Sequence, residues 1–397
     1  MFQNTSIYVR LNFTIRIFAQ DGTGGRLHSN TENRLEKLRA SLDSHPFDTL
    51  MVLVGENRRF LSGYTGEDGQ FDETAGVLLI SREKALLVTD SRYDLQAKRE
   101  APLYSVIRFK KGLFQELPDI LESMGTKNLG FESVRLSFSQ YRELSKAIAE
   151  KGSNIVLTAS MDLVENQRIQ KDPEEIGAIR AALSLTESVF LDFVKSITAG
   201  VTEKALAWEL EKRLRQAGAD GLSFPTIVAA GPNSALPHAI PSDRVVRENE
   251  PILFDFGIRL NGYCSDITRM AMIGEPDDTY RKIYRTVLDA QKKAIQAISP
   301  GKSSKEVDDA ARSHIAAMGY GDFFGHGLGH GVGLAIHEAP RLNALKDVPL
   351  APGMVTTVEP GIYLADWGGI RLENMVVVTD TGVEVLNETD PSDMIVL

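Results

Sequence analysis

The stretch 253-LFDFGIRLNGYCSDITR-269 has the pattern of a β-hairpin that carries two aspartates among apolar and β-branched residues. Asn261-Gly262, between two β-rich runs, is the strongest short-range signal for a two-residue type I′ turn. This turn sets Asp255 opposite Thr268, and because side chains alternate along a strand, Asp255 and Asp266 share one face. The hairpin is therefore expected to present two carboxylates on a diagonal.

Diagonal neighbours in such a pair lie roughly 7–8 Å apart at the backbone and closer at their side-chain tips, provided that no bulge intervenes. Two carboxylates that approach each other repel, so either one holds a proton or a cation lies between them. The alternative is that both aspartates are solvated on an open face of the hairpin. The rest of the sequence has to decide between these interpretations.

The stretch 325-GHGLGHGVGLAIHE-338 holds three of the chain's seven histidines, among glycines that let a backbone approach a site closely. The glycines match neither the GxGxxG nor the GxxxxGK[ST] phosphate-binding pattern. The HExxH pattern of the commonest mononuclear zinc peptidases is also absent, because Ala-Pro-Arg follows His337-Glu338. This clustering favours a functional site over separate structural histidines.

In 354-MVTTVEPGIYLADWGGIRLENMVVVTD-380, two β-rich runs each carry one embedded acid. Pro-Gly follows Glu359 directly, whereas Glu373 lies within a strand-like run, and either acid alone could be an exposed strand residue. Taken with the hairpin and the histidine cluster, four carboxylates and one imidazole favour hard or borderline divalent metals. Their number suits two ions that share ligands and polarise a carbonyl, which is hydrolase chemistry.

The composition is typical of a soluble globular chain, with 43% hydrophobic and 25% charged residues among 397. A net charge of -10 without a basic cluster argues against nucleic acid or an anionic membrane as the main partner. No run of 18 apolar residues is present, so no transmembrane helix is expected. The single cysteine, Cys264, fits a reducing compartment, and residues 1–30 lack a signal peptide's unbroken apolar region. We expect a cytoplasmic protein.

An N-terminal extension and two domains are expected from the order of the elements. Residues 1–30, with GTGG at 22–25 as a flexible link, are expected to form a poorly ordered extension outside the main fold, with a stray strand over the alternating residues 7–18 as the alternative. Strands then alternate with helices, which predicts an α/β domain over residues 31–160. Asp172-Pro173-Glu174-Glu175 is a helix start in a second, α+β domain over residues 161–397, where long helices alternate with paired strands.

The C-terminal part resembles the pita-bread metallopeptidases, which include methionine aminopeptidase, aminopeptidase P and Xaa-Pro dipeptidase (prolidase). The resemblance covers nearly the whole chain from about residue 32, and it implies a C-terminal pita-bread (creatinase/aminopeptidase) fold. Five segments match the family's ligand set in order: LFDFG, CSDITR, HGLGHGVG, TVEPGIY and IRLEN. The metal ligands that they imply are Asp255, Asp266, His330, Glu359 and Glu373.

The resemblance also implies roles around the metals. His238 matches a histidine that stabilises the tetrahedral intermediate or its leaving nitrogen, and His337 matches one that contacts the substrate carbonyl. His326 matches a position lining the proline pocket, and Arg371 an arginine that orients the ligands. Arg341 resembles an arginine by which prolidases bind the free carboxylate of a dipeptide, with a surface salt bridge as the alternative.

The N-terminal part resembles the creatinase/prolidase N-terminal domain, through 57-NRRFLSGYTG-66 and 88-VTDSRY-93. Methionine aminopeptidases lack this domain. In relatives it helps to form the dimer, so the resemblance implies a homodimer or a dimer of dimers. Two features depart from the family pattern: Asn374 follows the last ligand where an acid is common, and 67-EDGQFDE-73 lengthens the turn after YTG.

The function implied is a dinuclear-metal peptidase that hydrolyses the Xaa-Pro imide bond of di- or short peptides through a metal-bridging hydroxide. Glu359 would carry the proton, and His238 and His337 would stabilise developing charge. Manganese is the first expectation, with cobalt or zinc as alternatives. Action on longer peptides, as in aminopeptidase P, stays open. A creatinase-type C–N hydrolase and a non-catalytic peptide-binding protein are disfavoured by the complete ligand set.

Overall fold

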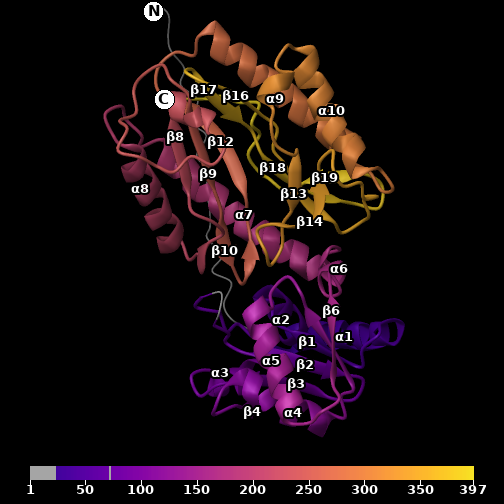
Figure 1. The fold of residues 1–397 in the computed structure, drawn as a ribbon. Coiled ribbons are helices and arrows are strands. Elements are labelled where there is room, and N and C mark those ends of the chain that lie inside the picture. Colours follow the sequence, from indigo (N-terminus) through magenta and orange to yellow (C-terminus); the bar gives the residue numbers. More distant parts are fainter. Residues whose placement is uncertain (1–23, 71–72) are drawn as a thin grey trace, which may run out of the picture. The chain divides into compact units, whose positions relative to one another are not determined.

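The computed structural model describes residues 24–70 and 73–397, and the chain divides into two compact units between Ser160 and Met161 (Figure 1). The expectation for residues 1–23 lies outside the described residues. Residues 24–30, expected in the extension, instead begin helix α1 (Gly24–Ser41). No helix in the described ranges is both long enough and apolar enough to cross a membrane.

The first unit is built on one six-stranded sheet with the order β4-β3-β2-β1-β5-β6. Its strands are β1 (Thr49–Val52), β2 (Val77–Ser81), β3 (Ala85–Thr89), β4 (Ser105–Arg108), β5 (Asn128–Glu132) and β6 (Val156–Ser160). Its other helices are α2 (Gly55–Ser62), α3 (Asp94–Glu100), α4 (Leu113–Met124) and α5 (Phe138–Glu150). Strands β2 and β3 read as unbroken apolar runs because both of their faces are buried.

The second unit contains two larger sheets, of order β20-β12-β9-β8 and β14-β13-β15-β18-β19. The strands of the first are β8 (Ile227–Ala230), β9 (Ile252–Phe256), β12 (Ile267–Met272) and β20 (Ile395–Val396). Those of the second are β13 (Gly329–Gly331), β14 (Glu338–Leu342), β15 (Val355–Val358), β18 (Asn374–Val378) and β19 (Val383–Val385). Smaller pairings join β16 (Gly361–Leu364) to β17 (Gly368–Arg371), and β10 (Ile258–Leu260) to β7 (Gly221–Leu222) and β11 (Tyr263–Cys264).

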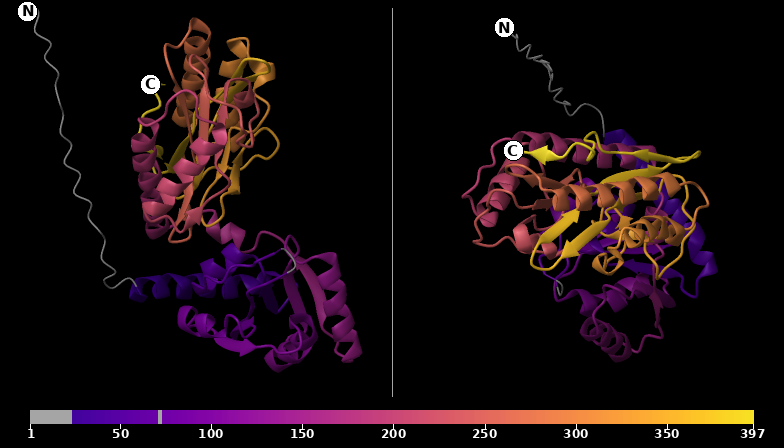
Figure 2. Two further views of the ribbon diagram at one scale, coloured as in Figure 1. Left: turned by 90° about the vertical axis from the view of Figure 1, so that its left-hand side faces the viewer. Right: turned by 90° about the horizontal axis from the view of Figure 1, so that it is seen from above.

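Two pairs of long helices cover these sheets from opposite sides (Figures 1 and 2). One pair is α7 (Pro173–Val194) and α8 (Glu203–Gln216), preceded by the short α6 (Glu165–Arg168), and the other is α9 (Asp278–Ala297) and α10 (Ser304–Ala317). Along β9, Phe254 and Phe256 pack in the core with α7 and α8, whereas Leu253 packs in the core with α9 and α10. By this alternation Asp255 points to the same side as Leu253.

The hairpin that carries both aspartates has the predicted register. Asp255 pairs with Thr268 across β9 and β12, and the same offset holds near the turn. Asn261 and Gly262 have positive φ angles of 51° and 86°, as a type I′ turn requires. No extra residue is therefore inserted between the turn and the two aspartates.

The strand pairing of this hairpin is nevertheless interrupted at Gly257, between β9 and β10. A Cβ atom added there would lie 2.0 Å from the carbonyl oxygen of Ser265, so the close approach of the two backbones requires glycine. Asp266 follows Ser265 and directly precedes β12. This interruption places the carboxylate of Asp266 at the start of β12, beside the carboxylate of Asp255, and the register of the hairpin is unchanged.

Candidate active site

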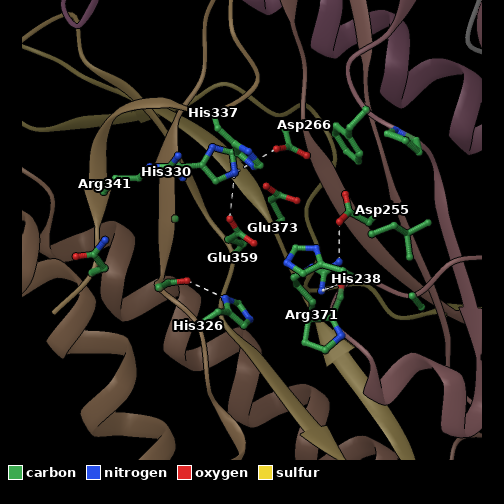
Figure 3. A pocket seen from close by; sticks show the side chains of 18 of the residues that line it. His238, Asp255, Asp266, His326, His330, His337, Arg341, Glu359, Arg371 and Glu373 are labelled. Carbon is green, nitrogen blue, oxygen red and sulfur yellow. Dashed lines mark hydrogen bonds and ion pairs between the residues drawn. The ribbon is translucent and has the colours of Figure 1, made fainter. Parts of the chain in front are cut away.

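The side chains expected as metal ligands lie together around one cavity of about 490 Å3 in the second unit (Figure 3). Each comes from a strand or from the residues next to one: Asp255 in β9, Asp266 before β12, His330 in β13, Glu359 after β15 and Glu373 before β18. One potential ligand atom from each of Asp266, His330 and Glu373 lies within 4.8 Å of the others. The structure thus brings the predicted set together.

The imidazole of His330 lies among hydrogen-bond acceptors on both of its ring nitrogens. Its Nδ1 lies 3.2 Å from the carbonyl oxygen of Gly331, which can only accept, so Nδ1 carries the proton. Its Nε2 lies 3.5 Å from Asp266 Oδ2 and 3.3 Å from Glu359 Oε1. Burial lowers the pKa of His330 to about 3, so Nε2 presents a lone pair to two carboxylates. Acceptors that face one another in this way need a proton or a cation between them.

The carboxylates give the same indication. Burial, and then the charges of Glu373 and Asp255, raises the pKa of Asp266 well above its usual range. Burial and neighbouring acids likewise raise the pKa of Glu373, and burial raises that of Glu359 to about 7. Asp255 Oδ1 is buried without a hydrogen-bond partner in the described part of the chain. Buried carboxylates with one neutral imidazole fit hard or borderline divalent cations.

Arg371, expected to orient the ligands, reaches two of them through hydrogen bonds. Its Nη2 donates to Asp255 Oδ2 at 2.6 Å, and its Nε donates to Thr268 Oγ1 at 3.0 Å. The Thr268 hydroxyl in turn donates to Glu373 Oε2 at 2.8 Å. The sequence interpretation gave Thr268 no role at the site, although the hairpin register that sets it opposite Asp255 was a usable signal.

His326 belongs to a directed chain of hydrogen bonds at one wall of the cavity. Its Nδ1 lies 2.8 Å from the Gly327 carbonyl oxygen and must donate, so its Nε2 accepts from the Tyr363 hydroxyl at 2.9 Å. The Tyr363 oxygen accepts from Arg371 Nη1 at 2.8 Å. Burial lowers the pKa of His326 to about 4 and so keeps the ring neutral. Tyr363 was missed from the sequence; only its place after Glu359-Pro-Gly could have indicated it.

The three remaining predicted side chains, His238, His337 and Arg341, also line the cavity. His337 packs edge-on against His330, with ring centroids 4.3 Å apart at 89°. Arg341 pairs across β13 and β14 with His330. Figure 3 shows Arg341 on the His330 side of the carboxylates and His238 near Arg371.

A buried ion cluster holds the segment that carries His337. Glu338 Oε1 lies 2.6 Å from Lys171 Nζ, and Glu338 Oε2 pairs with Arg168. All three side chains are almost wholly buried, and both cations come from the segment around α6. Sequence reasoning gave Glu338 no role, because nothing in the spacing connects it to residues more than a hundred positions earlier.

Glu373 lies in a break between β17 and β18, and not inside a strand as the sequence suggested. At this break Arg269 Nη1 donates to the carbonyl oxygen of Glu373. Its Nη2 lies 3.4 Å from Glu187 Oε1 and donates to Asn374 Oδ1 at 3.0 Å. Asn374 stands where the family often has an acid, and it contacts Arg269 outside the cavity. Within the described ranges, the guanidinium of Arg269 is therefore paired with the carboxylate of Glu187.

Replacing Glu187 by glutamine is expected to lower the free energy of unfolding of the second unit by about 3 kcal/mol, because the buried charge of Arg269 loses its paired carboxylate. An Asn374→Asp change in the same chain should recover part of this loss by supplying a new carboxylate. Urea unfolding followed by tryptophan fluorescence measures the second unit alone, since Trp208 and Trp367 are the chain's only tryptophans. Equal stability of the single and double variants would contradict this account.

Comparison with known proteins agrees with the fold. Residues 177–380 match metallopeptidase family M24, and residues 34–170 match the creatinase/prolidase N-terminal domain. An Xaa-Pro dipeptidase from Pyrococcus furiosus is 36% identical over 90% of this chain and 99% of its own length.

Two solved structures also superpose over most of both chains. An Xaa-Pro dipeptidase from Bacillus anthracis has a TM-score of 0.86 and 37% identity, covering 93% of this chain and 100% of that one. An X-Pro aminopeptidase from Thermotoga maritima has a TM-score of 0.81 and 38% identity, covering 90% and 100%. The predicted pita-bread fold with a creatinase-like N-terminal domain is confirmed. The chain is thus a metal-dependent hydrolase of metallopeptidase family M24.

Proposed function

We propose that this chain hydrolyses the Xaa-Pro imide bond at the N-terminus of dipeptides and short peptides, using two divalent metal ions. The observation that carries the proposal is the His330 lone pair, which faces Asp266 and Glu359 at 3.5 and 3.3 Å. The ligands proposed are Asp255, Asp266, His330, Glu359 and Glu373. When bound, two such ions polarise the scissile carbonyl and supply a nucleophilic water at neutral pH.

The choice of metal follows from the donors. Four carboxylates and one imidazole suit manganese first, and cobalt or zinc as alternatives, because oxygen-rich sites do not select strongly among these ions. No thiolate contributes, since the only cysteine, Cys264, lies outside the cavity lining and contacts the Leu334 carbonyl.

The chain's own residues account for proton transfer and charge stabilisation. Glu359 lies at the cavity wall beside His330 and is proposed to take a proton from the attacking water and deliver it to the leaving imide nitrogen. His238 and His337 line the cavity and are proposed to donate hydrogen bonds to the developing oxyanion and amine. Burial lowers the pKa of His337, so one of its nitrogens is left to donate.

Recognition of proline needs shape more than hydrogen bonding, because an Xaa-Pro bond is a tertiary amide without an N–H. His326 and Arg371 form a wall of the cavity, and the Tyr363 hydroxyl holds them in place by donating to His326 and accepting from Arg371. We propose that the pyrrolidine ring packs against this wall. The homodimer and the cytoplasmic location expected from the sequence stay predictions, and light scattering of purified protein tests the first.

The deciding experiment is hydrolysis of Ala-Pro and Ala-Pro-Ala by metal-stripped protein, with and without added manganese. We expect cleavage that manganese restores. Replacing Arg341 by alanine should raise KM for Ala-Pro about ten- to hundredfold if Arg341 binds the dipeptide carboxylate, which is the usual range for a lost charged hydrogen bond. The same change should affect Ala-Pro-Ala much less, because its carboxylate lies one residue further on.

Each other result has a definite meaning. Cleavage of the tripeptide alone would make the chain an Xaa-Pro aminopeptidase, as the Thermotoga maritima relative is described. In that case Arg341 would have no special role. Failure to cleave either peptide with manganese bound would refute the proposed bond specificity and point to another scissile bond.

A further inference from the structure

A second pocket adjoins the cavity and has no part in the function proposed so far. This outer pocket measures about 320 Å3 and is lined by Pro237, His238, Asp322, Phe323, Gly325, His326 and Tyr363. Pro237, His238 and His326 also line the central cavity, so the two spaces share a wall. Arg341 lines the central cavity and not the outer pocket.

The direction of the substrate follows from the proposed function. An enzyme that removes one N-terminal residue needs space for only that residue before the scissile bond. Every additional substrate residue lies after proline, on the side of the leaving group. A pocket that adjoins the cavity at His326, in the proposed proline wall, therefore suits the residue that follows proline.

The chemistry of the outer pocket favours a cationic side chain. Phe323 is 42% exposed and Tyr363 contributes a second aromatic ring, and such rings attract a cation through their faces. Asp322 adds a carboxylate to the same lining. The nearby cation Arg312 is neutralised by Asp308 at 2.8 Å and binds the carbonyls of Phe324 and His326. It therefore does not cancel the attraction for a basic residue.

We propose that the outer pocket binds the residue after proline and prefers arginine or lysine there, so that Xaa-Pro-Arg and Xaa-Pro-Lys peptides are favoured substrates. The preference rests on the proposed Xaa-Pro activity, but the pocket itself can be tested without turnover. An arginine side chain can stack on Phe323 while its guanidinium approaches Asp322.

The first test compares kcat/KM of the manganese-loaded protein for Ala-Pro-Arg and Ala-Pro-Ala. We expect the arginine peptide to be preferred about fivefold. Phe323→Ala and Asp322→Asn should each remove most of this preference. Trp208→Ala is the matched control, because Trp208 is also an exposed aromatic residue, at 67%, but lies on α8 away from the pocket lining.

The second test is calorimetric titration of the product peptides Pro-Arg and Pro-Ala into the same proteins. Tighter binding of Pro-Arg that depends on Phe323 and Asp322 supports the outer pocket even if no peptide is cleaved, and the proposed function alone would then fail. Equal binding of the two products, or equal losses in the Phe323→Ala and Trp208→Ala proteins, would overturn the outer pocket while leaving Xaa-Pro hydrolysis intact.

Discussion

An Asp255→Asn protein is expected to lose metal-dependent hydrolysis of Ala-Pro by more than about a hundredfold while keeping its fold. Changes to groups that only support a metal ligand already cost about ten- to hundredfold, so a change to a ligand should cost more. Asparagine keeps the shape and one oxygen, but it removes the charge that balances both the cations and Arg371, which donates to Asp255 at 2.6 Å. Steady-state rates with saturating manganese measure the effect.

Measured metal content and circular dichroism distinguish loss of metal binding from loss of the fold in this variant. If Asp255 holds an ion, the manganese bound per chain should fall together with activity, and circular dichroism should be unchanged. Asp309→Asn is the matched control, because Asp309 is exposed on α10 and does not line the cavity. Full activity in the Asp255→Asn protein would remove Asp255 from the site and weaken the whole ligand assignment.

The hairpin shows how far local sequence can carry a site prediction. The Asn261-Gly262 turn fixed the register, and the register alone placed Asp255 opposite Thr268 and on the same side as Asp266. These are short-range relations, because turn chemistry and side-chain alternation act over a few residues. The family's ligand order, and not geometry, was needed to bring in Glu359 and Glu373 from elsewhere in the chain.

What could not be predicted depends on contacts between distant segments. The bond from Thr268 to Glu373 and the pairing of Glu338 with Lys171 and Arg168 join elements that no spacing rule connects. Residues 24–30 were likewise assigned to the extension and not to a helix, because glycines at 24 and 25 are poor helix formers and local propensity is a weak guide. Burial and contacts with distant segments determine such pairings and helix ends.

A Glu359→Gln protein is expected to lose about a hundred- to ten-thousandfold in kcat, the usual contribution of a positioned proton carrier. Glutamine keeps an oxygen that can bind metal, so KM and bound manganese should change less than kcat. Glu248→Gln, at an exposed position outside the cavity lining, is the matched control. A large loss of bound manganese with little change in kcat at saturating metal would instead make Glu359 a ligand without a role in proton transfer.

The metal-free form of the same variant tests the environment of Glu359 by a separate route. Burial raises the pKa of Glu359 from 4.5 to about 7, so the folded chain holds a proton that the unfolded chain has released between these values. The stability from this proton is complete below pH 4.5 and is lost as the pH rises through about 7. Metal-free wild-type protein should therefore lose more stability against urea between pH 5 and pH 8 than the Glu359→Gln protein, because the buried histidines, whose lowered pKa values act in the opposite direction, are common to both. Manganese should reverse the Glu359 contribution by replacing the proton. Glutamine cannot titrate, so the variant should show a smaller decline, the remainder coming from Asp266 and Glu373, whose pKa values burial also raises. An identical decline in both proteins would mean that Glu359 is already ionised in the metal-free fold and that other groups carry the pH dependence.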